Sequence, residues 1–100
     1  MSRSPPSPAE PVAHLTGLGP ASAALLAQLG VRDAGALRER DAVALYLALK
    51  AIAPRTSLNM LYALIGAQEG IDWRVIARER RSALLTELDT RRQSQQRTRP

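Results

Sequence analysis

The sequence has no cysteine and no phenylalanine, and its only aromatic side chains are Tyr46, Tyr62 and Trp73. Without cysteine, the chain has no disulfide bond, no thiolate metal ligand and no cysteine nucleophile. Aromatic and β-branched side chains are too few to build a sheet of several strands. The core must come from leucine, alanine, valine and isoleucine, of which leucine and alanine are good helix formers. We therefore predict an all-α fold, a small bundle of about five short helices.

Long apolar stretches are also missing. The longest uninterrupted one, residues 42–49, is far shorter than the roughly 20 apolar residues needed to cross a bilayer. The first eleven residues contain four prolines and lack the apolar region of a signal peptide. These features predict a cytoplasmic protein with no membrane partner.

Residues that carry out catalysis or bind metals are scarce. His14 is the only histidine, so no histidine pair is available to hold a metal ion. Asp33, Asp41 and Asp72 stand where helix N-caps are expected, which gives them a structural role. The glycines at 17 and 19 do not follow a strand and so do not form a dinucleotide-binding turn. We predict no catalytic residue, no metal site and no cofactor, and therefore not an enzyme.

Composition divides the chain into three parts. Residues 1–13 are rich in proline and serine, and we expect them to form a disordered leader. Residues 14–91 hold nearly all of the apolar side chains and are expected to form one helical domain. Residues 92–100 are polar and basic and are expected to be a disordered tail.

Capping and breaking residues place five helices within this domain. Proline favours the first helical position, aspartate and serine favour the N-cap, and glycine favours the position after the last turn. The expected helices start at Pro20, after Asp33, at Ala42, after Ser57 and after Asp72, and end near residues 30, 40, 52, 70 and 91.

The patterns within three of these helices predict more. The helix at 42–52 is apolar nearly all round, which predicts that it lies at the centre of the bundle. The helix that follows Ser57 carries one apolar stripe that includes Leu61, and we expect Gly66 to interrupt it. The charged stretch at 78–81 predicts a kink or a short turn in the last helix.

The glycines before the first helix have a second interpretation. Residues 15–23 resemble the hairpin of helix-hairpin-helix DNA-binding modules. In those modules, a Gly-apolar-Gly turn and the N-terminus of the next helix hold a DNA phosphate with backbone N–H groups. The candidate nucleic-acid-binding residues here are Gly17, Leu18, Gly19 and Ser22. The alternative is a plain glycine turn that leads into a helix.

The net charge is +5, and in the last thirty residues eight arginines stand against four carboxylates. A basic end is typical of proteins that bind nucleic acid or an acidic partner, and also of solvated tails. Arg74, Arg78 and Arg81 follow at i, i+4 and i+7, so a continuous helix would place them on one face. In one interpretation this face contacts DNA phosphates; in the other it is a solvated face opposite Trp73.

The order of the residues resembles a known family. The most specific part is the block Ser57-Leu58-Asn59-Met60-Leu61-Tyr62-Ala63-Leu64. Other matching positions are Leu15, Leu18-Gly19-Pro20, Ser22-Ala23, Leu25-Leu26, Leu29-Gly30-Val31, Ala42-Val43, Tyr46-Leu47-Ala48-Leu49-Lys50, Gly70, Trp73 and Leu84-Leu85. In this order and spacing, roughly residues 14 to 88 resemble the C-terminal domain of the TfoX/Sxy competence regulators.

The resemblance implies a regulatory role. Members of the family regulate natural competence, which implies that they switch on DNA-uptake genes together with the cyclic-AMP receptor protein. In the two-domain regulators another domain precedes this one, whereas only the proline-rich leader stands before residue 14, so we expect a standalone domain. Arg40-Asp41 departs from the family pattern at a turn.

Two functions are compatible with these observations. The first is a DNA-binding accessory domain that contacts the phosphate backbone with the glycine turn and the arginine-rich end. The second is a protein-interaction module that docks on a transcription regulator, such as the cyclic-AMP receptor protein, without contacting DNA.

Overall fold

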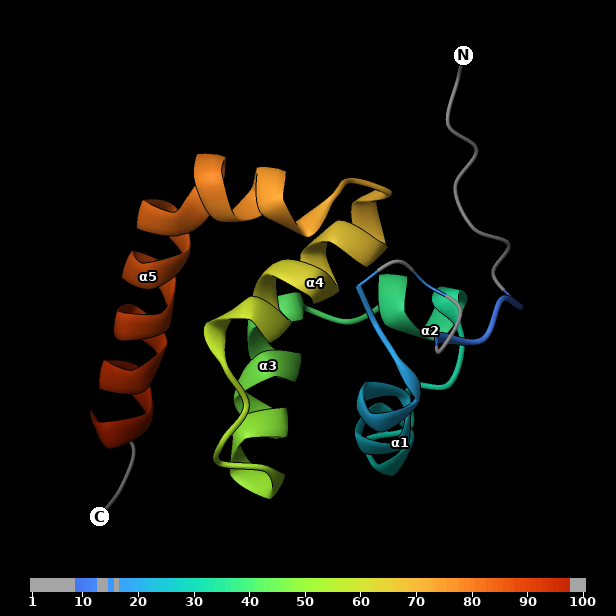
Figure 1. Cartoon of the computed structure of the whole chain (residues 1–100). Helices are drawn as coiled ribbons and strands as arrows, with labels where there is room; N and C mark the ends of the chain where they lie inside the picture. Colours follow the sequence, from blue (N-terminus) through green and yellow to red (C-terminus); the bar gives the residue numbers. More distant parts are fainter. Residues whose placement is uncertain (1–8, 13–14, 16, 98–100) are drawn as a thin grey trace.

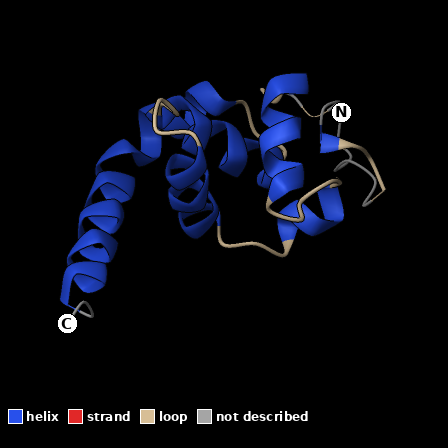
Figure 2. Cartoon of the chain, turned by 90° about the horizontal axis from the view of Figure 1, so that it is seen from below, coloured by secondary structure: helices blue, strands red, loops and turns tan. Residues whose placement is uncertain are grey.

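The computed structural model describes residues 9–12, 15 and 17–97, with the backbone alone for residues 95–97. This part of the chain forms five helices: α1 (Pro20–Gln28), α2 (Ala34–Arg38), α3 (Ala42–Ile52), α4 (Leu58–Glu69) and α5 (Trp73–Arg97) (Figure 1). The all-α prediction is confirmed, since the described ranges contain helices and loops but no strand (Figure 2). None of these helices is long and apolar enough to cross a membrane.

The capping residues predicted from the sequence begin the helices. The side chains of Asp33, Asp41 and Asp72 each accept hydrogen bonds from backbone N–H groups of the following turn, at 2.8 to 3.1 Å. Ser57 occupies the N-cap position of α4, but its side chain makes no capping hydrogen bond. Gly70 ends α4 with φ of +71°, a conformation that glycine adopts without steric cost.

The centre of the fold is α4 rather than α3. Residues 61–67 of α4 are all buried, and this helix packs against α2, α3 and α5. The prediction that the apolar helix at 42–52 lies at the centre is wrong, because one side of α3 remains open and Ile52 is 44% exposed. Gly66 does not interrupt α4, which continues through it to Glu69. The missing side chain at this buried glycine instead leaves room for the loop that follows the helix.

The folded part begins earlier than the expected boundary at residue 14. The Val12 N–H donates to the Arg32 carbonyl at 3.2 Å, and the Ala34 N–H donates to the Glu10 carbonyl at 2.9 Å. The Val12 side chain is buried at 2% exposure. This short segment is anchored because its backbone finds partners just before α2 and at its start, and because the valine side chain reaches the core. Residues 1–8, 13, 14 and 16, which include His14, lie outside the described residues.

The last helix also continues further than expected. α5 runs to Arg97 instead of ending near residue 91, so the segment expected to begin a disordered tail at 92 is helical as far as 97. Arg91 provides an anchor, because its guanidinium bonds the Asp41 carboxylate at the start of α3 at 2.7 Å. Residues 98–100 lie outside the described part of the chain.

In agreement with the kink predicted from the charged stretch at 78–81, α5 is bent, although it remains one continuous helix (Figure 1). Its first half packs against α4 and its second half runs beside α3 (Figure 1). The hydroxyls of Thr86 and Thr90 donate to carbonyls four residues earlier, at 3.0 and 2.9 Å. Hydrogen bonds of this kind compete with the helical ladder and commonly bend a helix. The bend places the arginines of the two halves of α5 in different surroundings.

Candidate nucleic-acid interface

The glycine turn before α1 lies against the start of α5. Gly17 has φ of +87°, which disfavours any residue with a side chain. A Cβ atom added to it would stand 3.5 Å from Cβ of Ala63 and 3.7 Å from Cδ1 of Trp73. The fold therefore joins the N-terminal candidate residues to the first residue of the arginine-rich helix, although they are far apart in the sequence.

The first turn of α1 presents unpaired backbone donors. Gly19 is the N-cap residue, it has no side chain to cap the helix, and Pro20 follows at the first helical position. Helical N–H groups of the first turn have no partner within the helix. A Cβ atom at Gly19 would meet nothing within 4 Å, so the space in front of this helix end is open. This geometry suits an anion held by backbone N–H groups.

Leu18 and Ser22, two of the predicted nucleic-acid-binding residues, are buried and partly buried. Leu18 is 5% exposed and belongs to the hydrophobic core, so its side chain anchors the turn to the core and does not face a ligand. Ser22 is partly buried in the first turn of α1. The turn therefore offers a ligand its backbone, chiefly through Gly19 and the residues that follow Pro20.

The three arginines predicted to share a face do so. Arg74, Arg78 and Arg81 line one shallow groove of about 450 Å³ between the first turns of α4 and the first half of α5. Its other lining residues are Leu58, Asn59, Tyr62, Trp73 and Ala77. The arginines border the same groove as the indole ring of Trp73, but Arg74 and Arg78 are also about three-quarters exposed, so this arrangement agrees with both interpretations of the face.

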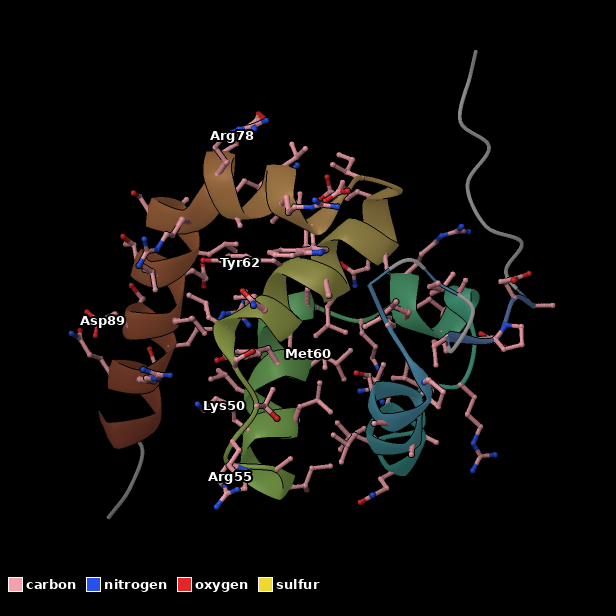
Figure 3. All side chains as sticks on the ribbon, viewed as in Figure 1. Lys50, Arg55, Met60, Tyr62, Arg78 and Asp89 are labelled. Carbon is pink, nitrogen blue, oxygen red and sulfur yellow. The ribbon has the colours of Figure 1, made fainter. Side chains whose placement is uncertain are left out.

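These three arginines are only weakly engaged within the protein. Arg74 pairs with Asp72 at 3.3 Å and lies over the Trp73 ring, 5.9 Å from its centroid, and its side chain is 73% exposed. Arg78 is 75% exposed and reaches the neighbouring Glu79 at only 3.9 Å. Arg81 has no ion pair with any residue that the structure describes. Figure 3 shows Arg78 at the outer edge of α5, directed away from α4.

Other arginines of α5 hold the fold together. Arg80 binds Glu69 with two hydrogen bonds of 2.6 Å, which ties α5 to the last turn of α4. This contact lowers the pKa of the Glu69 carboxyl below its ordinary value. Arg91 likewise lowers the pKa of Asp41, chiefly through their hydrogen bond. Because ion-paired arginines are less available to a phosphate, the structure separates these two from Arg74, Arg78 and Arg81.

The glycine turn and the arginine groove meet at Asn59. This exposed side chain lines the arginine groove and also a second groove bordered by Gly17, Ser57 and Ala63. We call the combined surface the basic face, defined by Gly17, Asn59, Trp73, Arg74, Arg78 and Arg81, and we include Gly19, which lines neither groove, because it belongs to the same glycine turn. Sequence reasoning missed Asn59, although an amide within the otherwise apolar stretch 58–67 marks an outward position.

The site contains no arrangement typical of catalysis. Within the described ranges, no three side chains of the types that hold metal ions come together. The basic face instead combines guanidinium groups, a partly buried indole ring and a helix N-terminus, which are groups that bind anions or stack on planar rings. Fold and site together are those of a small all-α domain with an arginine-lined groove.

Comparison with known families places this domain. The model of the TfoX C-terminal domain family matches residues 9–88 of the 100-residue chain. The chain therefore belongs to the TfoX C-terminal domain family, a family of competence-related regulatory domains. The match begins at residue 9, in agreement with the anchoring of Glu10 and Val12 in the fold. No curated protein and no solved structure matches the chain.

Proposed function

We propose that this domain binds the phosphate backbone of DNA through the basic face, as a non-enzymatic accessory in the transcriptional regulation of competence genes. The observation that carries the proposal is the gathering of Arg74, Arg78 and Arg81 in one groove, with little internal pairing, next to the groove that Gly17 borders. Guanidinium groups bind phosphate oxygens in a planar fork, and they remain charged at any physiological pH.

The composition of the face determines the kind of binding. Arginine and backbone N–H contacts to phosphates position a protein on DNA but read no base sequence. The groove is shallow and no helix projects from it, so we expect modest affinity and little sequence preference. Selection of target genes would then come from a second regulator on the same DNA. The cyclic-AMP receptor protein is the regulator that the family resemblance implies, and a cytoplasmic location is the corresponding expectation.

The test is a DNA titration at several salt concentrations. Each neutralised phosphate contributes about −0.9 to the slope of log affinity against log salt on B-DNA. Replacing Arg74, Arg78 and Arg81 with glutamine should therefore flatten the slope by up to about three units. No binding of the unmodified protein at low salt, where electrostatic attraction is strongest, would contradict the proposal.

A matched control separates this face from the overall positive charge. Arg78→Gln/Arg81→Gln and Arg32→Gln/Arg55→Gln each remove two positive charges. Arg32 and Arg55 are exposed and have no ion pair among the described residues. Arg55 lies at the far end of α3 from Arg78 (Figure 3). Only the first pair should flatten the slope strongly; equal effects would mean that the positive charge acts without a defined site.

A third variant tests the helix end without disturbing the fold. Gly19 has φ of −113°, which any residue adopts, and an added side chain meets nothing within 4 Å. Gly19→Val should therefore leave the melting temperature nearly unchanged while it blocks the approach of a phosphate to the first turn of α1. Unchanged DNA affinity would remove α1 from the interface.

A further inference from the structure

One side of α3 is only partly covered by the rest of the described chain. Ala44, Leu47, Ala48 and Ala51 recur at i, i+3, i+4 and i+7, so they form one continuous apolar stripe. Ala44 and Ala51 are exposed, and Leu47 and Ala48 are only partly buried. This stripe is why the helix is apolar nearly all round without lying at the centre of the fold.

The stripe is the floor of a groove with a basic wall. The groove measures about 690 Å³, and its opposite wall is the end of α5, with Arg91, Arg92 and Ser94. Lys50 lies at its edge, on the side of α3 that faces α5 (Figure 3). Asp89 points away from the groove, on the outer side of α5 (Figure 3).

Two of the groove's cations have no carboxylate partner in the described structure. Arg91 is neutralised by Asp41 and Glu87, both at 2.7 Å. Lys50 donates to the carbonyl oxygen of Thr56 at 3.3 Å, which leaves its charge unpaired. Arg92 is exposed and forms no ion pair with the described residues. Among the described residues, no carboxylate lines the groove, so its rim attracts negative charge.

We propose that this groove docks an amphipathic helix with acidic flanks, contributed by a different protein. An apolar floor with unpaired cations at its edges matches a helix whose apolar face is bordered by glutamate or aspartate. Small side chains on the floor allow close approach of the helix. The stripe runs from Ala44 to Ala51, about 11 Å along α3, so about two turns of a docked helix fit along it.

Charge argues against the other occupants. A second copy of the chain carries a net charge of +5, and α1 to α4 together contain only one carboxylate, Glu69. Such a chain has no acidic helix to place between Lys50 and Arg92. A nucleic acid would meet an alanine and leucine floor that offers no donors to phosphate. The groove therefore serves a partner distinct from the one that the basic face binds.

The probe is a synthetic helical peptide of about four turns, with leucine on one face and glutamate on both flanks, read by fluorescence anisotropy. A matched peptide replaces every glutamate with lysine. We expect the acidic peptide to bind at least about tenfold more tightly than the basic one, because like charges at the rim oppose docking. Backbone amide NMR shifts should change at Ala44, Ala48 and Ala51 and not at Gly17. Equal binding of both peptides, or shifts confined elsewhere, would overturn the proposal.

Charge-reversed variants locate the contact. Arg92→Glu should weaken the acidic peptide by about tenfold or more, whereas Arg32→Glu, with the same change in net charge, should change its affinity less than about twofold. Ala48→Glu should block peptide binding by placing a charge on the floor of the groove. Arg92 is exposed on α5, so Arg92→Glu tests the groove without a risk to folding. Equal losses in Arg92→Glu and Arg32→Glu would contradict a defined groove. A dimer in sedimentation that Ala48→Glu dissociates would replace the proposed partner with a second copy.

The two proposals fail independently. Loss of peptide binding in Arg92→Glu with the DNA salt slope retained is the expected pattern. Absence of DNA binding would leave the peptide measurements unaffected, because the groove and the basic face share no lining residue.

Discussion

The carbonyl oxygen of Ile71 lies directly against Gly66, where a Cβ atom added to the glycine would be only 2.4 Å away. The Ile71 N–H also donates to the Gly66 carbonyl at 2.9 Å, so the loop after α4 folds back on this residue. A side chain of any size would push apart the link between α4 and α5, and with it the position of Trp73 beside the glycine turn.

Gly66→Ala should therefore destabilise the protein, although alanine normally favours a helix. Overpacking of this kind costs roughly 1–3 kcal/mol, which exceeds the gain of up to about 1 kcal/mol from alanine in a helix. Chemical denaturation measures the difference. Gly19→Ser is the matched control, because its side chain enters open space and supplies an N-cap hydroxyl. A Gly66→Ala variant as stable as the original would disprove the close contact.

The buried stripe of α4 gives a second prediction. Leu61 is 0% exposed, and Leu61→Ala should lower the free energy of unfolding by about 2–5 kcal/mol, because it leaves a cavity in the core. Leu85 on α5 is 42% exposed, and Leu85→Ala should change stability by less than about 0.5 kcal/mol. Urea denaturation followed by circular dichroism compares the two; similar values would mean that Leu61 is not in the core.

The ion pairs of α5 predict a loss of stability in acid. The pKa of Glu69 is lowered from 4.5 by its hydrogen bonds to Arg80, and the pKa of Asp41 is lowered from 3.8 by Arg91. Because the unfolded chain binds these protons more readily, the stabilisation is complete above pH 4.5 and is lost as the pH falls through the lower native values.

Glu69→Gln and Asp41→Asn test this dependence. Both pairs are substantially exposed, so each should contribute only about 0.2–1 kcal/mol near neutral pH. Asparagine keeps an acceptor at the N-cap of α3, so Asp41→Asn removes the charge and retains the cap. Denaturation at neutral pH and near pH 3 should show a smaller acid-induced loss in either variant. Curves parallel to that of the unmodified protein would mean that the pairs do not persist in solution.

The N-terminal anchor predicts an effect far from the helices. Val12 is 2% exposed, and Val12→Ala should destabilise the fold by about 1–2 kcal/mol, corresponding to two buried methyl groups. The hydrogen bond from its backbone N–H to the Arg32 carbonyl does not depend on the side chain, so the segment should stay bonded to residue 32. A thermal melt reports the change. An unchanged melting temperature would place Val12 outside the core.

Trp73 supplies a direct optical signal for the basic face. It is the only tryptophan in the chain, and it lies in the arginine groove beneath Arg74. DNA binding should change its emission, because a bound phosphate moves the guanidinium that covers the ring. The acidic peptide in the α3 groove should leave the emission unchanged. A response to the peptide and none to DNA would reverse the assignment of the two surfaces.

Much of this structure was predictable because it depends on near neighbours in the chain. Proline at the first position of α1 and aspartates before α2, α3 and α5 act within one helical turn of their own positions. The spacing of Arg74, Arg78 and Arg81 likewise defines a face as soon as the helix is continuous. The role of that face is still a proposal, since spacing describes geometry and not the ligand.

Contacts between distant segments were not predictable from one sequence. Glu10 and Val12 gain their partners only when residues 32–34 pass beside them. Asp41 meets Arg91 across fifty positions. The same chemical group therefore has different roles: Arg80 and Arg91 hold helices together, whereas Arg78 and Arg81 remain open.

The five helices and their starting residues follow from local features, because caps, breakers and apolar periodicity act through nearby hydrogen bonds and side-chain spacing. Tertiary packing sets the central position of α4, the contact between the glycine turn and Trp73, and the partly open side of α3. These outcomes depend on which surfaces meet when the helices pack. Packing is a property of all the helices together, so no single segment of sequence encodes it.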